Sequence, residues 1–213
     1  MGSKIFVKTL VVGELQTNAY IAGCPRGKLA AVIDPGAEGE LILREITSLG
    51  FELSCILLTH GHYDHIGSVS TLQRATGAPV MVHAADVPML TDAAANLSQM
   101  LGFRYACGMP QRELRDNDIV EVGEFRLRVQ HTPGHTPGSV CYVGPELVFS
   151  GDTLFAGSIG RTDFPGGSFR QLITSVKERL LQLPDETVVY PGHGPATTIG
   201  EERENNPFLT AQW

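Results

Sequence analysis

Three histidines and an aspartate occur within six residues of the sequence, in the stretch Thr59-His60-Gly61-His62-Tyr63-Asp64-His65. The apolar run at residues 55–58 comes directly before it, and such a run followed by glycine predicts a buried strand that ends in a turn. His60 and His62 are two residues apart, so they project to the same side of an extended backbone. Imidazole and carboxylate groups are good ligands for zinc, iron or manganese. The stretch therefore predicts a strand-to-helix turn with enough donors for two cations.

Three further segments place a possible ligand beside glycine at the end of an apolar run. They are His131-Thr-Pro-Gly-His135, Gly151-Asp152 and Gly192-His193-Gly194. His135 is the better ligand candidate of its rigid loop, and His131 is interpreted as a structural or supporting group. A carboxylate at Asp152 suits a position between two cations, and the glycines around His193 allow a close backbone approach. Strand ends on one edge of a sandwich can therefore gather all seven donors.

The elements that must position these donors follow from the spacing of apolar residues and turn signals. Strands are expected near residues 5–12, 18–21, 29–33, 55–58, 80–82, 119–122, 125–129, 140–143, 147–149 and 187–190. Helices are expected near residues 38–49, 66–75, 86–101 and 168–183, with a short acidic helix from Gly200. Asp86 and Ser168 are the expected N-caps of two of them. Early strands alternate with helices and hairpins fill the middle, which predicts two packed sheets with helices outside.

Length, composition and charge exclude several classes of protein. The 213 residues, 42% of them hydrophobic, suit one globular domain spanning 1–213. No apolar run approaches the roughly 20 residues of a membrane span, and the first residues lack a leader-like apolar region, so a cytoplasmic, membrane-free protein is expected. The net charge of −7 argues against a nucleic-acid-binding surface. The four cysteines show no paired spacing and are expected to be free, buried thiols.

The motifs taken together resemble those of a known family. Thr59-His60-x-His62-x-Asp64-His65, His135, Gly151-Asp152 and Gly192-His193-Gly194 resemble the metallo-β-lactamase superfamily in order and spacing. Gly151-Asp152-Thr-Leu-Phe155 and Gly160-Arg161-Thr-Asp-Phe164 are similar to the glyoxalase II branch, and within it to short bacterial hydroxyacylglutathione-hydrolase-like proteins. The resemblance implies an α+β fold, the αββα sandwich. It assigns His60, His62 and His135 to one metal, Asp64, His65 and His193 to the other, and Asp152 to both.

Such a donor set predicts hydrolytic chemistry. Two divalent cations about 3.5–4 Å apart lower the pKa of a water held between them, and the resulting hydroxide attacks a carbonyl. Zinc is the expected metal, with iron and manganese as alternatives. Asp152, as the bridging ligand, and Asp64, which could also orient the hydroxide or carry its proton, are the expected catalytic carboxylates. A thioester is the easiest acyl target because its thiolate leaves readily.

The expected partner is therefore a small thioester, glutathione-derived if the resemblance extends to the substrate. Arg161 lies where the family places a basic glutathione contact, and Tyr63 is expected to form a wall of the site. Two features depart from the longer glyoxalase II proteins. The C-terminal helical region that carries their basic glutathione contacts has no counterpart before residue 213, and Pro195 lies where they have a tyrosine.

Other functions fit the same motifs less well. A glutathione persulfide dioxygenase of this superfamily shares Gly160-Arg161-Thr162-Asp163-Phe164 but uses one iron, held by two histidines and an aspartate. These dioxygenases also retain most of the second-metal residues, so the motifs alone do not separate the two enzymes; the complete donor set that includes His193 favours the hydrolase. A nuclease would need an added domain and a basic groove. A purely structural metal site would be closed and richer in cysteine.

Overall fold

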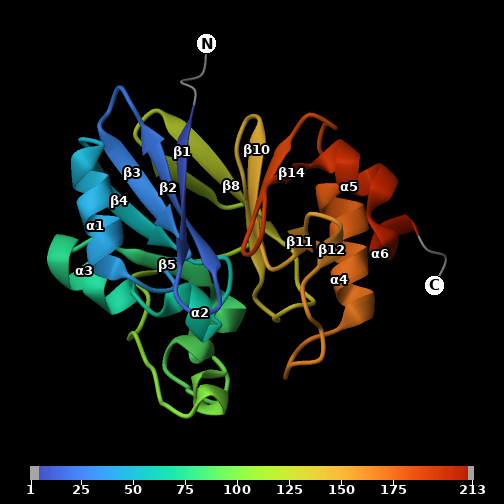
Figure 1. Ribbon diagram of the computed structural model, residues 1–213, viewed down its shortest axis with the longest axis horizontal. Helices are drawn as coiled ribbons and strands as arrows, with labels where there is room; N and C mark the ends of the chain where they lie inside the picture. The colour runs from blue at the N-terminus through green and yellow to red at the C-terminus, as the bar shows by residue number, and fades with distance from the viewer. Residues whose placement is uncertain (1–4, 211–213) are drawn as a thin grey trace.

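Two six-stranded sheets form the centre of the computed structural model, which describes residues 5–210 (Figure 1). The first sheet has the order β1-β2-β3-β4-β5-β6, formed by Phe6–Val12, Thr17–Cys24, Leu29–Ile33, Glu52–Leu57, Val80–His83 and Arg112–Leu114. The second has the order β14-β13-β10-β9-β8-β7, formed by Thr197–Thr198, Val188–Pro191, Leu147–Gly151, Val140–Val143, Phe125–His131 and Ile119–Val122. A separate hairpin joins β11 (Leu154–Phe155) to β12 (Ser158–Ile159).

The residue pattern of the central strands explains why they are buried on both faces. In β2, Ile21 points to the core under the first helical layer, whereas Tyr20 and Ala22 point between the sheets. This alternation follows from the two-residue period of a strand. Leu127, Tyr142 and other residues of the second sheet complete the core between the sheets. The central strands β2, β9 and β10 are apolar over most of their length and are buried on both faces, whereas the outer strands β7 and β8 leave side chains such as Glu121 and Arg126 in solvent.

Helices cover the two outer faces, so the described residues form an αββα sandwich as predicted (Figure 1). On the first sheet lie α1 (Gly39–Ser48) and α3 (Val69–Thr76), and the one-turn helix α2 (Tyr63–Ile66) follows β4. On the second lie α4 (Phe169–Ser175) with its π-helical continuation η3 (Val176–Leu180), α5 (Ile199–Asn205) and α6 (Pro207–Thr210). Within residues 5–210 no helix is long and apolar enough to cross a membrane.

The prediction of one helix over residues 86–101 is wrong. Two short 3₁₀ helices occupy this region, η1 (Ala84–Leu90) and η2 (Ser98–Leu101). Asp86 does not cap a helix, because its carboxylate binds groups of two other loops. The buried amide of Asn96 donates to the carbonyls of Met89 and Tyr105 and folds the chain back into a loop. Tertiary hydrogen bonds thus override the local helical pattern.

Smaller differences concern element ends. The helix expected at 66–75 is broken at Gly67, and the one expected at 168–183 changes to π-helix after Ser175. Ser168 caps α4 as predicted, accepting from the amide of Gln171. Strand β6 was not predicted; it pairs parallel with β5. The four cysteines are free and buried, which confirms the prediction. Residues 1–4, which bear on the predicted lack of a leader, lie outside the described residues.

The strand ends that carry the donor motifs meet at one edge of the sandwich. Strands β10 and β13 run parallel, and Gly151 pairs with Pro191 at their ends, so Asp152 and His193 emerge side by side. Across the sandwich, the amide of Val140 donates to the carbonyl of Thr59 over 2.8 Å. This bond joins the start of β9 to the turn after β4. Both sheets therefore contribute to a single site.

Candidate metal centre

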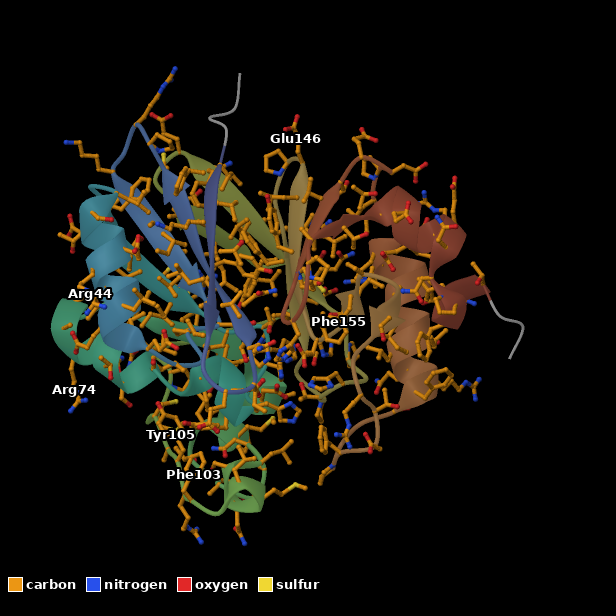
Figure 2. The ribbon with its side chains drawn as sticks, viewed as in Figure 1. Arg44, Arg74, Phe103, Tyr105, Glu146 and Phe155 are labelled. Carbon is orange, nitrogen blue, oxygen red and sulfur yellow. The ribbon has the colours of Figure 1, made fainter. Side chains whose placement is uncertain are left out.

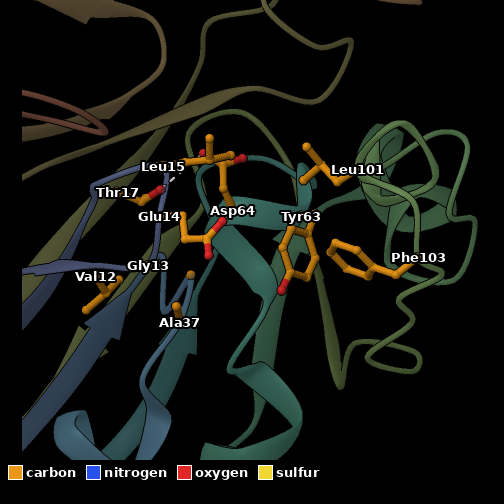
Figure 3. Close-up of a pocket in the computed structure, with 11 residues that line it drawn as sticks. Val12, Gly13, Glu14, Leu15, Thr17, Ala37, Tyr63, Asp64, Leu101 and Phe103 are labelled. Carbon is orange, nitrogen blue, oxygen red and sulfur yellow. Dashed lines mark hydrogen bonds between the residues drawn. The ribbon is translucent and has the colours of Figure 1, made fainter.

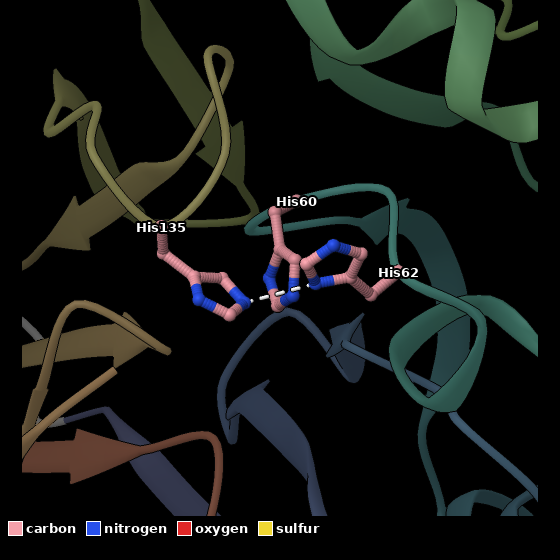
Figure 4. A group of neighbouring side chains, drawn as sticks. All are labelled: His60, His62 and His135. Carbon is pink, nitrogen blue, oxygen red and sulfur yellow. Dashed lines mark hydrogen bonds between the residues drawn. The ribbon is translucent and has the colours of Figure 1, made fainter. Parts of the chain in front are cut away.

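Three buried imidazoles form the first donor cluster, made of His60, His62 and His135 (Figure 4). Their relative exposures are 1%, 4% and 3%, so bulk water barely reaches them. The Nδ1 atom of His62 lies 2.9 Å from the Nε2 atom of His135. One donor atom from each ring lies within 4.8 Å of the other two, a spacing that suits a single cation.

The second cluster combines Asp64, His65 and His193, with Asp152 between it and the first. The Oδ2 atom of Asp64 is 3.4 Å from His65 Nε2 and 3.2 Å from His193 Nε2. Asp152 Oδ1 lies 3.3 Å from His65 Nε2, and its Oδ2 atom lies 3.5 Å from His135 Nε2. The carboxylate of Asp152 thus faces both clusters. The His193 side chain is 29% exposed, so the second cluster is the more open one.

Hydrogen bonds fix the tautomer of most of these rings. Three histidines direct Nδ1 at an oxygen that can only accept: His65 at Asp34 Oδ2 (2.9 Å), His135 at the Arg161 carbonyl (2.7 Å) and His193 at the Leu15 carbonyl (3.1 Å). His60 directs Nδ1 at Thr59 Oγ1, whose own proton goes to Asp34. Each Nδ1 is therefore a donor, and each neutral ring presents an Nε2 lone pair to the centre.

Buried polar atoms without partners show that the centre fits metal ions. Among the described residues, His60 Nε2, His65 Nε2 and Asp152 Oδ1 are buried and accept or donate no hydrogen bond. Buried polar atoms are normally satisfied, because each unsatisfied one costs about 1–3 kcal/mol. His65 Nε2 and Asp152 Oδ1 lie 3.3 Å apart, where the two clusters meet. Nitrogen and oxygen donors without a cysteine suit zinc, iron or manganese.

The two clusters differ in electrostatics. Burial lowers the pKa of His60 well below its usual value and that of His62 to about 3, and the neighbouring rings add to this effect. These rings are neutral at pH 7 and ready to act as ligands. Burial would also lower the pKa of His65, but the carboxylates of Asp64 and Asp152 outweigh it and raise that pKa well above the usual value. A divalent cation at the second cluster takes the place of this proton.

Two supporting aspartates were missed in the sequence. Asp34 is buried; it accepts from the Thr59 amide (2.7 Å) and hydroxyl (2.6 Å) and from His65. Asp86 accepts from the amides of Gly61 (3.0 Å) and Gly138 (2.7 Å) and so joins the His60 turn to the His135 loop. A carboxylate directly after an apolar strand was the signal for Asp34. Asp86 carried no signal, because its partners come from distant loops.

Glycines in the motifs leave space for the two donor clusters because they have no side chain. A Cβ atom on Gly151 would lie 2.3 Å from Thr59 Oγ1, and one on Gly192 would lie 2.1 Å from Asp152 Oδ1. Real Cβ atoms do not approach so closely, so any side chain here would displace a donor or its support. The prediction that glycine beside His193 allows a close approach is thus confirmed for Gly192.

The remaining predicted site residues lie around the centre. Tyr63 lines a pocket next to Asp64. The guanidinium of Arg161 donates twice to Asp163 (3.0 and 2.8 Å) and lies over the ring of Phe164, while its carbonyl holds His135. His131 belongs to neither cluster; it stacks on His83 with ring centroids 4.1 Å apart.

Comparisons with known proteins agree with this geometry. A model of the Metallo-beta-lactamase superfamily matches residues 12–193. The hydroxyacylglutathione hydrolase GloC of Haemophilus influenzae is 38% identical over 189 residues, which cover 87% of this chain and 89% of GloC. The family match over residues 12–193 includes all seven donors.

Solved structures show the same fold. The crystal structure of the BLEG-1 B3 metallo-β-lactamase is 40% identical, with a TM-score of 0.92 and coverage of 97% of this chain and 100% of that one. The structure of TTHA1623 in a di-iron-bound form is 42% identical, with a TM-score of 0.85 and coverage of 95% and 100%. With the motifs, the αββα sandwich and the family match in agreement, the chain belongs to the metallo-β-lactamase superfamily.

Proposed function

We propose that this protein is a dinuclear metal-dependent hydrolase that cleaves thioesters of the hydroxyacylglutathione type. His60, His62 and His135 would hold one divalent ion, Asp64, His65 and His193 the other, and Asp152 would bind both. The observation that carries the proposal is the pair of clusters on a shared carboxylate, with oriented lone pairs and unsatisfied buried atoms. The broad class, a metal-dependent hydrolase, is also supported by the GloC relative and the superfamily match.

The residues of the chain prepare this chemistry. Divalent ions at these donors supply an activated water and polarise a carbonyl. Asp64 borders the open side of the centre, where a substrate would lie, and its Oδ2 atom accepts from Thr17 Oγ1 over 3.1 Å. The charge of His65 lowers the pKa of Asp64 although burial opposes this, so the carboxylate is ionised and available to a cation. Both sheets contribute donors, so we propose that one domain carries the activity.

Metal stoichiometry gives a first prediction. We expect the purified protein to bind two equivalents of zinc or iron per chain under anaerobic conditions, because each cluster alone offers at least three donors. Titration of metal-free protein followed by elemental analysis would measure this. His193→Ala is the matched variant and should keep the first equivalent. Saturation of the unaltered protein at one equivalent would contradict the dinuclear assignment.

The substrate contact of Arg161 gives a second prediction. A guanidinium holds a carboxylate through two hydrogen bonds, but here it is already paired with Asp163. If glutathione displaces Asp163, Arg161→Ala should raise KM for a glutathione thioester about tenfold with kcat retained. Asp163→Asn is the matched control and should lower KM, because it frees the guanidinium. An equal loss on a small uncharged thioester would show that Arg161 only supports the loop of His135.

Two alternatives are tested by the same experiment. Hydrolysis of a β-lactam is favoured by the 40% identity with BLEG-1 over nearly the whole chain. A mononuclear iron glutathione persulfide dioxygenase is the other alternative. The complete second cluster disfavours it, because a single iron does not need those donors. S-lactoylglutathione hydrolysis, β-lactam ring opening and oxygen uptake on glutathione persulfide should be measured side by side on metal-loaded and metal-free protein. We expect metal-dependent thioester hydrolysis to dominate; oxygen uptake or ring opening without it would overturn the proposal.

A further inference from the structure

A pocket opens beside the second cluster, between the β1–β2 turn and the segment that follows η2 (Figure 3). Its volume is about 460 Å³, within the range of small-ligand sites. The lining residues are Val12, Gly13, Glu14, Leu15, Thr17, Gly36, Ala37, Tyr63, Asp64, Leu101 and Phe103. We call this space the β1–β2 pocket. Because Asp64 forms part of its wall, a molecule in the pocket would reach the metal centre.

The walls of the β1–β2 pocket are apolar side chains that the fold leaves in solvent. Leu15, Leu101 and Phe103 are 51%, 52% and 39% exposed, although side chains of this kind are normally buried. The ring of Phe103 meets that of Tyr63 edge-on, with centroids 4.6 Å apart. In Figure 3 the two rings stand together on one side, near Leu101, and Leu15 lies beside Asp64. Exposed apolar residues gathered around a cavity indicate a ligand site.

The carboxylates of the pocket away from the metal centre disfavour an acidic ligand. Glu14 and Asp64 are its charged lining residues, and the described lining contains no lysine, arginine or histidine. Glu38 adds a third carboxylate nearby, since it accepts from the amide of Gly13. Figure 2 shows Arg44 and Arg74 far from Phe103, on the outer helices. Arg104 follows Phe103 in the chain but does not line the pocket. The cation that Asp64 would bind offsets the charge of Asp64 itself, but a carboxylate at the far end of the pocket would meet Glu14 and Glu38 with no basic side chain in the lining.

The cationic side of the metal centre lies elsewhere. Arg161 and Phe164 adjoin the first cluster, where the Phe164 ring packs on His62 and the Arg161 carbonyl holds His135. The β1–β2 pocket adjoins the second cluster through Asp64. A thioester across the centre would therefore meet a cation on one side and an apolar cavity on the other. An acidic thiol such as glutathione suits the first side, which leaves the pocket for the acyl group.

We propose that the β1–β2 pocket selects thioesters with an uncharged, apolar acyl group larger than lactoyl, and that Glu14, Leu101 and Phe103 determine this specificity. The inference rests on the proposed thioester hydrolysis and names its substrate class. Lactoyl carries a hydroxyl and only three carbons, so it would leave most of the apolar wall in water. Each methylene that enters the pocket instead removes apolar surface from water.

A series of glutathione thioesters tests the proposal on metal-loaded protein. From acetyl through butanoyl to hexanoyl, kcat/KM should rise about threefold per methylene, since one buried methylene contributes close to a fourfold gain. Pentanoyl and glutaryl form a matched pair, equal in length but with a methyl or a carboxylate at the end. We expect pentanoyl to be preferred about tenfold or more.

Variants locate the effect in the pocket. Phe103→Ala and Leu101→Ser should each lower the hexanoyl-to-acetyl ratio about threefold to tenfold, and Glu14→Lys should reverse the preference for pentanoyl over glutaryl. Met109→Ala removes an exposed apolar side chain outside the pocket and should leave both ratios unchanged. Far-ultraviolet circular dichroism would verify that each variant is folded.

The outcomes separate this inference from the proposed function. Hydrolysis of all acyl groups at similar rates, or a preference for glutaryl, would overturn the pocket's role and leave thioester hydrolysis standing. If Met109→Ala changes the substrate ratios as much as Phe103→Ala does, the role of the pocket is also overturned. A metal-loaded protein that cleaves none of the thioesters would overturn both proposals.

Discussion

Asp152→Ala should lower kcat/KM by about 10³-fold, a loss of roughly 4 kcal/mol of transition-state stabilisation, and should reduce metal binding in both clusters. The reason is its position: one carboxylate oxygen faces His65 and the other faces His135. No other described side chain lies between the clusters in this way. Its removal therefore takes a donor from both ions and leaves the distance between them undefined.

His193→Ala should cost less, about 10²-fold, because His193 belongs to the second cluster alone. The first cluster keeps its three imidazoles in this variant. Kinetics and elemental analysis on the same preparations would measure the ranking. Asp152→Asn is the matched control, since it keeps the shape but removes the charge, and should resemble the alanine variant in metal content. Equal metal content and equal rates in Asp152→Ala and His193→Ala would contradict a bridging role.

Asp34→Ala is expected to have the next largest effect, although Asp34 belongs to neither assigned ligand set. The substitution leaves three buried donors without an acceptor: the amide and hydroxyl of Thr59 and Nδ1 of His65. The free energy of unfolding should fall by about 3 kcal/mol, since each lost partner leaves a desolvated group. Metal affinity at the second cluster should fall about 10- to 100-fold, because the His65 ring loses the bond that orients it.

Urea unfolding of metal-free protein and metal titration would measure the two effects separately. Asp34→Asn keeps the size of the side chain but turns one acceptor into a donor, so it should restore part of the stability and little of the metal affinity. If Asp34→Ala destabilises the protein while metal affinity stays unchanged, Asp34 only supports the fold at the end of β3. If neither quantity changes, the hydrogen bonds of Asp34 contribute no net free energy to folding or to metal binding.

The donors and the fold class could be read from the sequence because both depend on local patterns. Apolar runs followed by a glycine-containing turn marked the strand ends. His60 and His62 lie in the turn after one of these runs, residues 55–58. The two-residue period of strands and the alternation of strands with helices predicted the two sheets. The helix expected at 86–101 failed because Asp86 and Asn96 bond to partners that the local pattern does not contain.

The sequence alone therefore determined the kind of chemistry: seven nitrogen and oxygen donors, and the strands that carry them. The tertiary structure decided how they are used. The parallel pairing of β10 with β13 brings Asp152 beside His193, and Asp34, which directly follows β3, orients His65. The β1–β2 pocket combines residues from four distant segments, so no single stretch of the sequence predicts it. Ligand types are encoded in residues, whereas orientation, burial and the shape of a cavity arise only when distant segments pack together.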